Sequence, residues 1–267
     1  MAGRSEPFEL ELLGGGPEAI YRRMRPEVEA LPWHSLDAAA HDRASVDEAR
    51  LVWTFAAFQE HRTGAACAAT LQALITSRAP LDLIAMAAGF PVDEMVHVEM
   101  CSRLAMQLGG AARLNHDPDD MVTVPPRHHR PTLRCAELVV RAFCVGEAVS
   151  IPLLREAAEQ ATHPLLHAML SQIAQDEAAH GSFGWIYLDW AEDQLDAADR
   201  AYLSSCALDE IRKLESTWAG TIERARAVQL PERLGWLPQE TYLASAYRSL
   251  EDKVKRPLSE RGLYAAA

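Results

Sequence analysis

The sequence predicts an all-α protein: a four-helix bundle with a long crossover between its second and third helices, plus additional N- and C-terminal helices. Two observations support this fold class. Long segments with apolar residues at helical spacing are separated by short turns, and one proline-rich segment interrupts them near the middle of the chain. Alternation of apolar and polar residues, which is typical of strands, never extends beyond a few residues.

The length and composition are sufficient for one sizeable hydrophobic core. The chain has 267 residues, of which 49% are apolar and 24% are charged, so a second core is not required. We therefore expect one domain overall. It would consist of an N-terminal arm (residues 1–44), the bundle itself (45–193) and C-terminal helices packed on the bundle (194–267).

The first half of the bundle is delimited by helix-capping signals. Ser45-Val46-Asp47-Glu48 matches a capping box, which predicts a helix from residue 45 to about residue 77. A second helix is expected from Pro80 to about Leu108, where Gly109-Gly110 closes it. Residues 110–132 contain several prolines and no sustained periodicity, so we interpret them as the crossover.

The second half repeats this layout. A third helix is expected over residues 132–161, and His163-Pro164 marks a tight turn into a fourth helix that continues to about residue 193. Further helical segments are expected over residues 196–228 and 238–256. The arm contains Gly14-Gly15-Gly16 and several prolines, and we expect it to be loosely helical.

The charge and the cysteine content limit the cellular location and the binding partners that we expect. The net charge is −12 and the sequence pI is about 5.3, whereas binding to nucleic acid or an anionic membrane usually needs a basic face. Five scattered cysteines include no C-x-x-C pair, which disfavours both a disulfide framework and a structural zinc site. The N-terminal segment is acidic, unlike a signal peptide, and no apolar run is long enough to cross a bilayer, so the expected location is the cytoplasm.

A repeated motif organises the chain. Asp93-Glu94-Met95-Val96-His97 and Asp176-Glu177-Ala178-Ala179-His180 each place a glutamate and a histidine three residues apart, on the same face of a helix. In each half a further glutamate lies upstream in an apolar helical segment, Glu60 before the first motif and Glu147 before the second. The two halves therefore share the pattern Glu … Asp-Glu-x-x-His.

Four glutamates on apolar helix faces need compensation, because an ionised carboxylate that is buried alone costs several kcal/mol or takes up a proton. Two divalent cations would balance four carboxylates, and two neutral imidazoles would complete the ligand shells. A Glu from each of two helices with Glu-x-x-His from each of the other two is a recurring di-iron or di-manganese ligand set. The alternative is that these residues are exposed or salt-bridged and fall in register by chance. The candidate metal ligands, which we also take as the catalytic residues, are Glu60, Glu94, His97, Glu147, Glu177 and His180.

With these motifs, residues 46–193 resemble the ferritin-like di-iron carboxylate superfamily, in particular its oxygen-activating members with an Asp-Glu-x-x-His motif. The resemblance implies a role for the two aspartates. Asp93 would hold His180, and Asp176 would hold His97, each through the ring nitrogen that does not face the metal. The alternative is that both aspartates are exposed on their helices.

The resemblance implies a non-haem di-iron oxidase or oxygenase that activates O2 to oxidise a small organic substrate by hydroxylation, desaturation or N-oxygenation. Its cofactor would be two Fe ions, with Mn or a mixed Fe/Mn pair left open. Electrons would come from an external donor such as a ferredoxin or a flavin reductase, because the sequence shows no flavin, haem or iron–sulfur motif. No nucleic-acid or membrane partner is expected, and a homodimer is left open.

Other functions are compatible with the same motifs. A manganese catalase has a similar ligand set and remains an alternative. Iron storage is disfavoured by the length of the chain and by two complete histidine motifs, and a rubrerythrin-like peroxidase by the missing cysteine pairs. A metal-free helical interaction module is a different class. The arylamine N-oxygenase branch is similar in ligand spacing, but this chain has Ile173 where that branch has a seventh ligand, a histidine.

Residues beside the ligands carry further expectations. Pro91 and Pro152 each remove a helical hydrogen bond, and the resulting kinks would either open a pocket or, at Pro91, displace Glu94 from its expected position. Cys101, one turn beyond His97, is interpreted as a buried structural thiol. The absence of tyrosine there and at Gly184 disfavours a tyrosyl-radical subunit. Small residues would leave room for a substrate and three larger ones would give it apolar walls: Ala56, Ala57, Gly64, Gly146, Gly181 and Gly184 in the first set, and Phe143, Ile151 and Ile173 in the second. The alternative is that larger neighbours from the adjacent helix fill this space.

Overall fold

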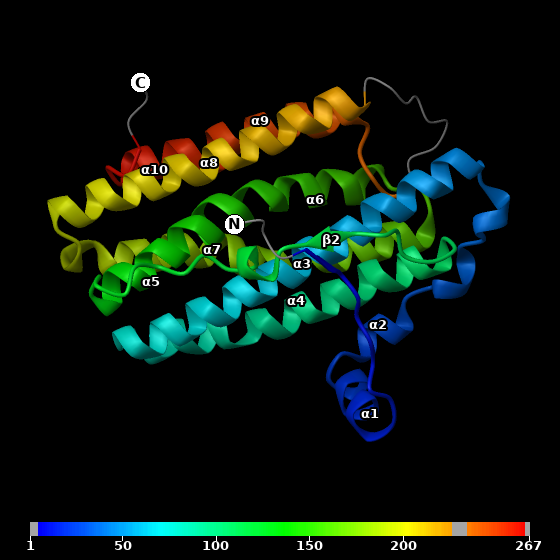
Figure 1. Ribbon diagram of the computed structural model, residues 1–267, viewed down its shortest axis with the longest axis horizontal. Helices are drawn as coiled ribbons and strands as arrows, with labels where there is room; N and C mark the ends of the chain where they lie inside the picture. Colours follow the sequence, from blue (N-terminus) through cyan, green and yellow to red (C-terminus); the bar gives the residue numbers. More distant parts are fainter. Residues whose placement is uncertain (1–4, 226–233, 265–267) are drawn as a thin grey trace.

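A computed structural model describes residues 5–225 and 234–264 (Figure 1). Helix accounts for 78% of the structure and strand for 2%, so the predicted all-α class is confirmed. The end of the helical segment expected over residues 196–228 falls partly outside the described residues. Within the described ranges, no helix has both the length and the hydropathy needed to cross a bilayer.

The first pair of long helices is α3 (Arg43–Ser77) and α4 (Leu81–Gln107). The expected start at Ser45 is wrong: Asp42 caps α3, because its side chain accepts a hydrogen bond of 3.0 Å from the backbone N–H of Ser45. The helix ends at Arg78, whose φ of 58° is left-handed and turns the chain towards α4. The Gly109-Gly110 closure is present, with the N–H of Gly110 donating to the carbonyl of Ala105 at 3.1 Å.

The second pair consists of a continuous helical segment and α7 (Pro164–Ala191). The continuous segment includes α5 (Pro131–Val139), the π-helical turns η4 (Val140–Glu147) and α6 (Ala148–Gln160). A regular third helix was expected, so the π-helix is a correction. His163 caps α7, because its Nδ1 accepts a hydrogen bond of 3.2 Å from the N–H of Leu165.

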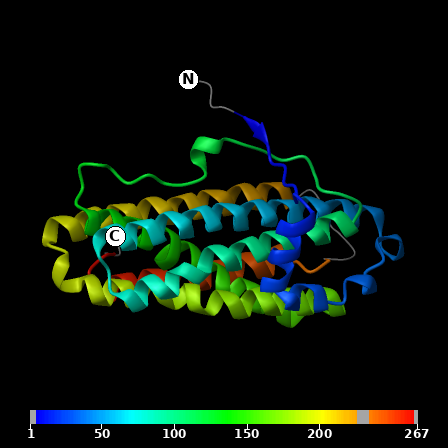
Figure 2. The same ribbon diagram turned by 90° about the horizontal axis from the view of Figure 1, so that it is seen from below.

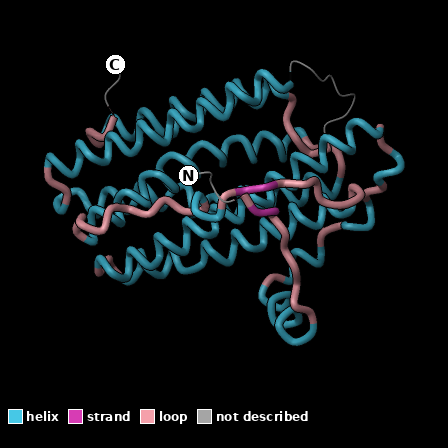
Figure 3. The backbone as a smooth tube through the Cα atoms, in the orientation of Figure 1, coloured by secondary structure: helices cyan, strands magenta, loops and turns pink. Residues whose placement is uncertain are grey.

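These helical segments surround a common core. α3 packs against α4 and α5, α4 against α7, and α7 against α5, η4 and α6, and their axes run alongside one another in Figures 1 and 3. The largest fully buried side chains come from every segment, including Trp53, Met100, Phe143 and Tyr187. Burial of each such side chain contributes about 1.5–3 kcal/mol, and this packing fixes the inward faces of the helices.

The N-terminal arm and the crossover meet on the outside of this core (Figure 2). The two-residue strand β1 (Glu6–Pro7) pairs antiparallel with β2 (Asn115–His116), with Glu6 opposite His116. Such short strands leave no alternating pattern, which is why the sequence did not predict them. The remaining elements of the arm and crossover are α1 (Gly15–Met24), α2 (Pro26–Ala30), η1 (Trp33–Ser35), η2 (Ala38–Ala40) and η3 (Pro118–Asp120).

The C-terminal helices cover η4 and α6. After η5 (Glu192–Gln194), α8 (Ala197–Ala225) packs against η4, and α9 (Gln239–Ser249) packs against α6. The chain continues through the π-helical turns η6 (Leu250–Lys255) into α10 (Arg256–Glu260). These contacts matter for the candidate site, because η4 ends at Glu147.

Candidate metal centre

The structure brings all six predicted ligands together in the interior. Glu60 comes from α3, Glu94 and His97 from α4, Glu147 from the last position of η4, and Glu177 and His180 from α7. They form two groups, and within each group the potential ligand atoms lie within 4.8 Å of one another. The first group is Glu60, Glu94, His97 and Glu177, and the second is Glu94, Glu147, Glu177 and His180.

Glu94 and Glu177 belong to both groups. The Oε2 atom of Glu94 lies 3.7 Å from Nδ1 of His97, and its Oε1 atom lies 3.0 Å from Nδ1 of His180. Glu177 repeats the arrangement, with Oε1 at 3.2 Å from His97 and Oε2 at 2.8 Å from His180. Each central carboxylate therefore presents one oxygen to each imidazole, while Glu60 and Glu147 each belong to a single group.

Burial separates this cluster from solvent. Glu94, His97 and His180 are fully buried, and Glu147 and Glu177 nearly so. The side chain of Glu60 is 17% exposed. Of the two alternatives for Pro91, displacement of Glu94 does not occur: α4 continues through Pro91 and Glu94 faces the interior one turn later.

The second proline, Pro152, is compensated from a distant element. Proline leaves the carbonyl four residues earlier, that of Ala148, without its helical donor. The hydroxyl of Ser249 at the end of α9 donates to this carbonyl at 3.2 Å and lies equally close to the carbonyl of Val149. Because Ser249 is 3% exposed, α9 satisfies a buried polar group directly beside Glu147.

Close packing against α7 positions the π-helical turns that end at Glu147. A Cβ atom added at Gly184 would lie 2.7 Å from Sγ and 3.0 Å from the backbone nitrogen of Cys144. Only glycine permits this approach of η4 to α7. π-Helical turns inside an α-helix frequently lie at functional sites. The hydroxyl of Ser150 then donates to Oε2 of Glu147 at 3.3 Å.

The unpaired atoms of the cluster fit a bound cation. Both carboxylate oxygens of Glu94, Oε2 of Glu177 and the Nδ1 atoms of His97 and His180 are buried without a hydrogen-bond partner among the described residues. Glu137 shows the contrast: it is also buried, but its oxygens accept hydrogen bonds from Arg141 at 3.1 Å and Tyr202 at 2.8 Å.

Even the 2.8 Å contact between Nδ1 of His180 and Glu177 lacks hydrogen-bond alignment. A hydrogen bond is favourable only when the donor hydrogen points at the acceptor. The ligand atoms therefore converge on shared space between them, where a divalent cation would compensate the carboxylates. The donor set of oxygen and imidazole nitrogen suits iron and manganese.

Proton affinities in the cluster reflect burial and mutual charge. Burial raises the pKa of the Glu60 carboxyl to about 8, opposed by its contact with His97, and burial with the charge of Glu177 raises the pKa of Glu147 well above its usual range. Burial alone would lower the pKa of His180, but Asp93, Glu177 and Glu94 raise it to about 12. Without a cation, the cluster therefore retains protons that a divalent cation would displace.

Both expected contacts between an aspartate and a histidine are present. Nε2 of His97 lies 3.3 Å from Oδ2 of Asp176, and Nε2 of His180 lies 3.5 Å from Oδ2 of Asp93. Each pair connects α4 with α7, so the aspartate of one motif contacts the histidine of the other. With Nε2 engaged in this way, Nδ1 of each imidazole faces the glutamates.

Sequence reasoning missed Arg25, between α1 and α2 in the N-terminal arm. Its Nη1 donates to Oδ1 of Asp93 at 2.7 Å, and its Nη2 donates to Oδ2 of Asp176 at 2.9 Å. The first of these contacts spans 68 residues of sequence, and no local motif points to it. Its position before Pro26 gave no functional signal.

Aromatic side chains cover His180. The ring centroids of Phe90 and His180 lie 4.2 Å apart. The rings of Phe90, Phe143 and Phe183 contact one another, with centroids 5.0–5.6 Å apart. All three phenylalanines are buried. This apolar cover excludes water from one side of the cluster. Cys101 is 1% exposed, as expected for a buried thiol.

The space beside two of the small residues, Gly64 and Gly181, is occupied. A Cβ atom added at Gly181 would lie 2.2 Å from Cδ1 of Ile151, and one added at Gly64 would lie 2.5 Å from Cε of Met95. At these two glycines the alternative therefore holds, and larger neighbours fill the space that a substrate would need. They bring neighbouring helices close enough for side chains from those helices to fill the space.

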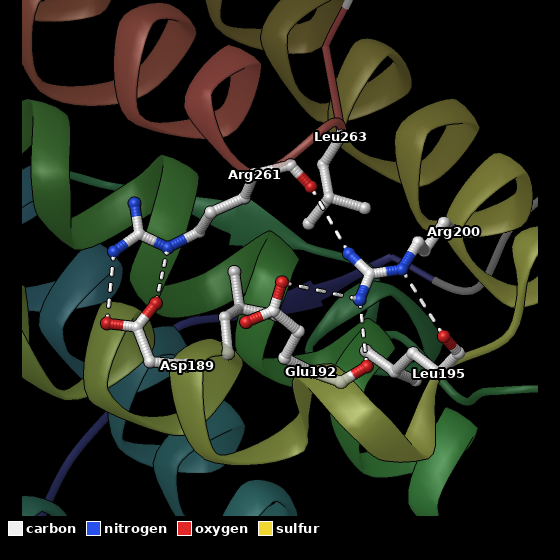
Figure 4. Close-up of a pocket in the computed structure, with 7 residues that line it drawn as sticks. Asp189, Glu192, Leu195, Arg200, Arg261 and Leu263 are labelled. Atoms are coloured by element: carbon white, nitrogen blue, oxygen red, sulfur yellow. Dashed lines mark hydrogen bonds and ion pairs between the residues drawn. The ribbon is translucent and has the colours of Figure 1, made fainter.

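Two hollows lie away from the cluster, and none of the six residues lines either. The smaller, about 20 Å³, lies at the end of α7 (Figure 4), where Arg261 pairs with Asp189 at 2.7 Å and Arg200 donates to the carbonyl of Glu192 at 2.8 Å. The larger, about 220 Å³, lies between the end of α6 and residues 235–238. Both guanidinium groups in the smaller hollow are engaged with the protein.

Comparison with known proteins gives no match: no protein-family model, no curated protein and no solved structure shows significant similarity to this chain.

Proposed function

We propose that the chain is a ferritin-like dinuclear metal enzyme, a non-haem di-iron oxidase or oxygenase that uses O2 to oxidise a small organic substrate. One observation supports this most strongly: the two ligand groups share Glu94 and Glu177. Shared carboxylates are what a pair of adjacent ions requires, whereas a mononuclear site needs no second group.

The helix order supports a ferritin-like arrangement. α3 and α4 form one pair and the α5–η4–α6 segment and α7 form another, with the crossover of residues 110–130 between them. Ferritin-like bundles have one such long connection. In this arrangement Glu60 and Glu147 are the single glutamates, and the two Glu-x-x-His motifs occupy the facing helices α4 and α7.

Each ligand then has a defined task. Glu60 and His97 would hold one ion and Glu147 and His180 the other, while Glu94 and Glu177, which belong to both groups, would serve both ions. A reduced iron pair held there would supply two electrons for reaction with dioxygen. The aspartates orient the imidazoles, and the phenylalanine cover excludes water from the His180 side. A separate protein would return the electrons, and Fe, Mn or a mixed pair fits the donor set.

A second candidate is a manganese catalase or another peroxide- or iron-handling protein. The packing of Ile151 against Gly181 and of Met95 against Gly64 favours it, because these contacts leave little space for an organic substrate beside the ligands. Hydrogen peroxide or an iron ion needs far less space. The ligand groups themselves suit either candidate.

The two candidates differ in what they do with oxygen. The protein should be loaded anaerobically with Fe(II) or Mn(II), mixed with O2, and monitored for O2 uptake and new visible absorption. Peroxide disproportionation is assayed in parallel. Oxygen uptake by the iron form that disappears in Glu147→Gln supports the oxygenase over a manganese catalase. Rapid O2 evolution from peroxide without O2 uptake supports the catalase, and less than one equivalent of metal after supplemented expression excludes both.

A further inference from the structure

A single guanidinium connects the two aspartates that contact the histidines. Arg25 uses separate nitrogens for Asp93 and Asp176, at 2.7 Å and 2.9 Å. The two aspartates contact His180 and His97 in turn. A continuous chain of polar contacts therefore connects the two imidazoles, running from His180 through Asp93, Arg25 and Asp176 to His97.

In this series of contacts, each oxygen of the two aspartates has a defined partner. Asp93 accepts from Arg25 with Oδ1 and faces His180 with Oδ2. Asp176 uses Oδ2 for both Arg25 and His97, while its Oδ1 accepts from Gln172 at 3.0 Å. Every oxygen of both aspartates thus has a partner, and neither carboxylate can rotate without breaking one.

We propose that Arg25 is a positioning residue for the metal centre: it fixes Asp93 and Asp176 together, so that both imidazoles direct Nδ1 to the metals. This inference rests on the proposed function for its metal-dependent consequences. The arrangement of the imidazoles is a property of the polypeptide itself. The N-terminal arm thereby becomes part of the site, although it contributes no ligand.

Arginine suits this position for a geometric reason. Its planar fork donates to two acceptors at once from different nitrogens, whereas the ammonium of lysine is a compact point charge. The Nε of Arg25 is also engaged, with Glu27 in the arm, so the guanidinium plane is held from three sides. Its side chain is 13% exposed, which limits competition from water.

The charge of Arg25 would also affect the redox potential of a metal pair held at this site. Asp93 and Asp176 add two negative charges behind the histidines, and Arg25 offsets one of them. Loss of this positive charge would favour the more highly charged, oxidised metal pair. The midpoint potential should therefore fall when Arg25 becomes neutral and change less when lysine retains the charge.

The N-terminal arm also contacts α4 through residues other than Arg25, and one of these residues provides a matched control for the Arg25 variants. Arg22 on α1 pairs with Glu99 of α4 at 2.8 Å, and Arg103 of α4 pairs with Glu29 of α2 at 2.7 Å. The hydroxyl of Tyr21 donates to the carbonyl of Met95 at 3.3 Å. Arg22→Gln weakens docking of the arm without touching either aspartate, so it separates a docking effect from a positioning effect.

The first experiment needs no metal. In metal-free protein labelled with 15N at histidine, the Nε2–H protons of His97 and His180 should give protected, downfield-shifted signals because they face aspartates. We expect Arg25→Gln to broaden or remove both signals, Arg25→Lys to remove at least one, and Arg22→Gln to keep both. Circular dichroism verifies that each variant is folded. Retention of both signals in Arg25→Gln, or equal loss in Arg22→Gln, would overturn the proposal.

The second experiment uses the metal-loaded protein. We expect Arg25→Gln to weaken metal binding about 10–100-fold, the usual effect of losing a group that orients a ligand, and to lower the midpoint potential. Arg22→Gln should stay close to wild type in both. If wild type binds no metal, the proposed function fails, and the histidine signals still decide the role of Arg25. If wild type and Arg25→Gln bind metal equally well, the positioning role is refuted.

Discussion

Glu94 and Glu177 face each other from α4 and α7, and each presents one carboxylate oxygen to His97 and the other to His180. Glu60 and Glu147 lack this relationship, because each belongs to one ligand group. The four glutamates are therefore unequal, and their unequal roles can be tested by metal stoichiometry.

Substitution of a single-group glutamate should remove one metal, and substitution of a shared one should remove both. We expect Glu147→Gln to bind about one metal per chain, because Glu60, Glu94, His97 and Glu177 still form a complete group. Glu177→Gln should bind little or none. Elemental analysis of folded, supplemented protein measures this difference. Two metals per chain in Glu147→Gln would contradict the assignment of Glu147.

The aspartates should affect metal affinity although neither is a ligand. Asp176→Asn weakens the orientation of His97, and Asp93→Asn that of His180, so we expect each to lower metal affinity about 10–100-fold. Titration with a competing chelator measures this. Asp189→Asn is the matched control, because Asp189 on α7 also pairs with an arginine, Arg261, but lies outside the cluster. Equal losses in all three variants would point to a general effect on folding.

Stability of the metal-free protein should fall as the pH rises from about 5 to about 8. Burial raises the pKa of Glu60 to about 8 from 4.5 and that of Glu147 well above its usual range, so the folded chain binds more protons than the unfolded chain. Their contribution is present below the unfolded pKa and is lost as the pH rises. Each extra bound proton changes stability by up to about 1.4 kcal/mol per pH unit.

His180 acts in the same direction, because its raised pKa also makes the folded chain retain a proton. Glu177 acts in the opposite direction, since its pKa lies below the usual range, but its contribution is lost only at more acidic pH. Urea unfolding with chelator present, at several pH values, measures how steeply the free energy of unfolding falls with pH. A smaller slope is expected for Glu60→Gln and for metal-loaded protein. Rising stability of the chelated protein across this interval would refute the explanation.

The hydroxyl of Ser249 should stabilise the fold through the carbonyl that Pro152 leaves without a helical donor. Ser249→Ala leaves the carbonyl of Ala148 buried without this partner, which costs about 1–3 kcal/mol. Ser182→Ala is the control, because the exposed Ser182 hydroxyl donates only within its own helix. Urea unfolding compares the two variants. In Pro152→Ala the helical donor returns, so Ser249→Ala should then cost less.

The sequence was most informative where a contact depends on local spacing. Glu94 and His97 are three residues apart, as are Glu177 and His180, so helix geometry alone places each pair on one face. Repetition of the motif then predicted that the two faces meet. The predicted helix boundaries were close to the observed ones for the same reason. The exception is the start predicted at Ser45, because Asp42 is an equally good cap one turn earlier.

Contacts between distant segments were not predictable in this way. Arg25 reaches Asp176 across 151 residues, and Ser249 reaches Ala148 across 101. The π-helical turns before Glu147 depend on packing against Gly184 and on α8, which no local pattern records. Whether a glycine leaves a cavity or admits a neighbour also depends on the other helix, as Gly181 and Ile151 show.

The most direct test is anomalous diffraction from crystals grown with iron or manganese, recorded at the edges of both elements. We expect two peaks about 3.5–4 Å apart between Glu94 and Glu177, one next to His97 and the other next to His180. A single peak, peaks outside the cluster, or carboxylates that remain unliganded in metal-saturated crystals would contradict a dinuclear centre.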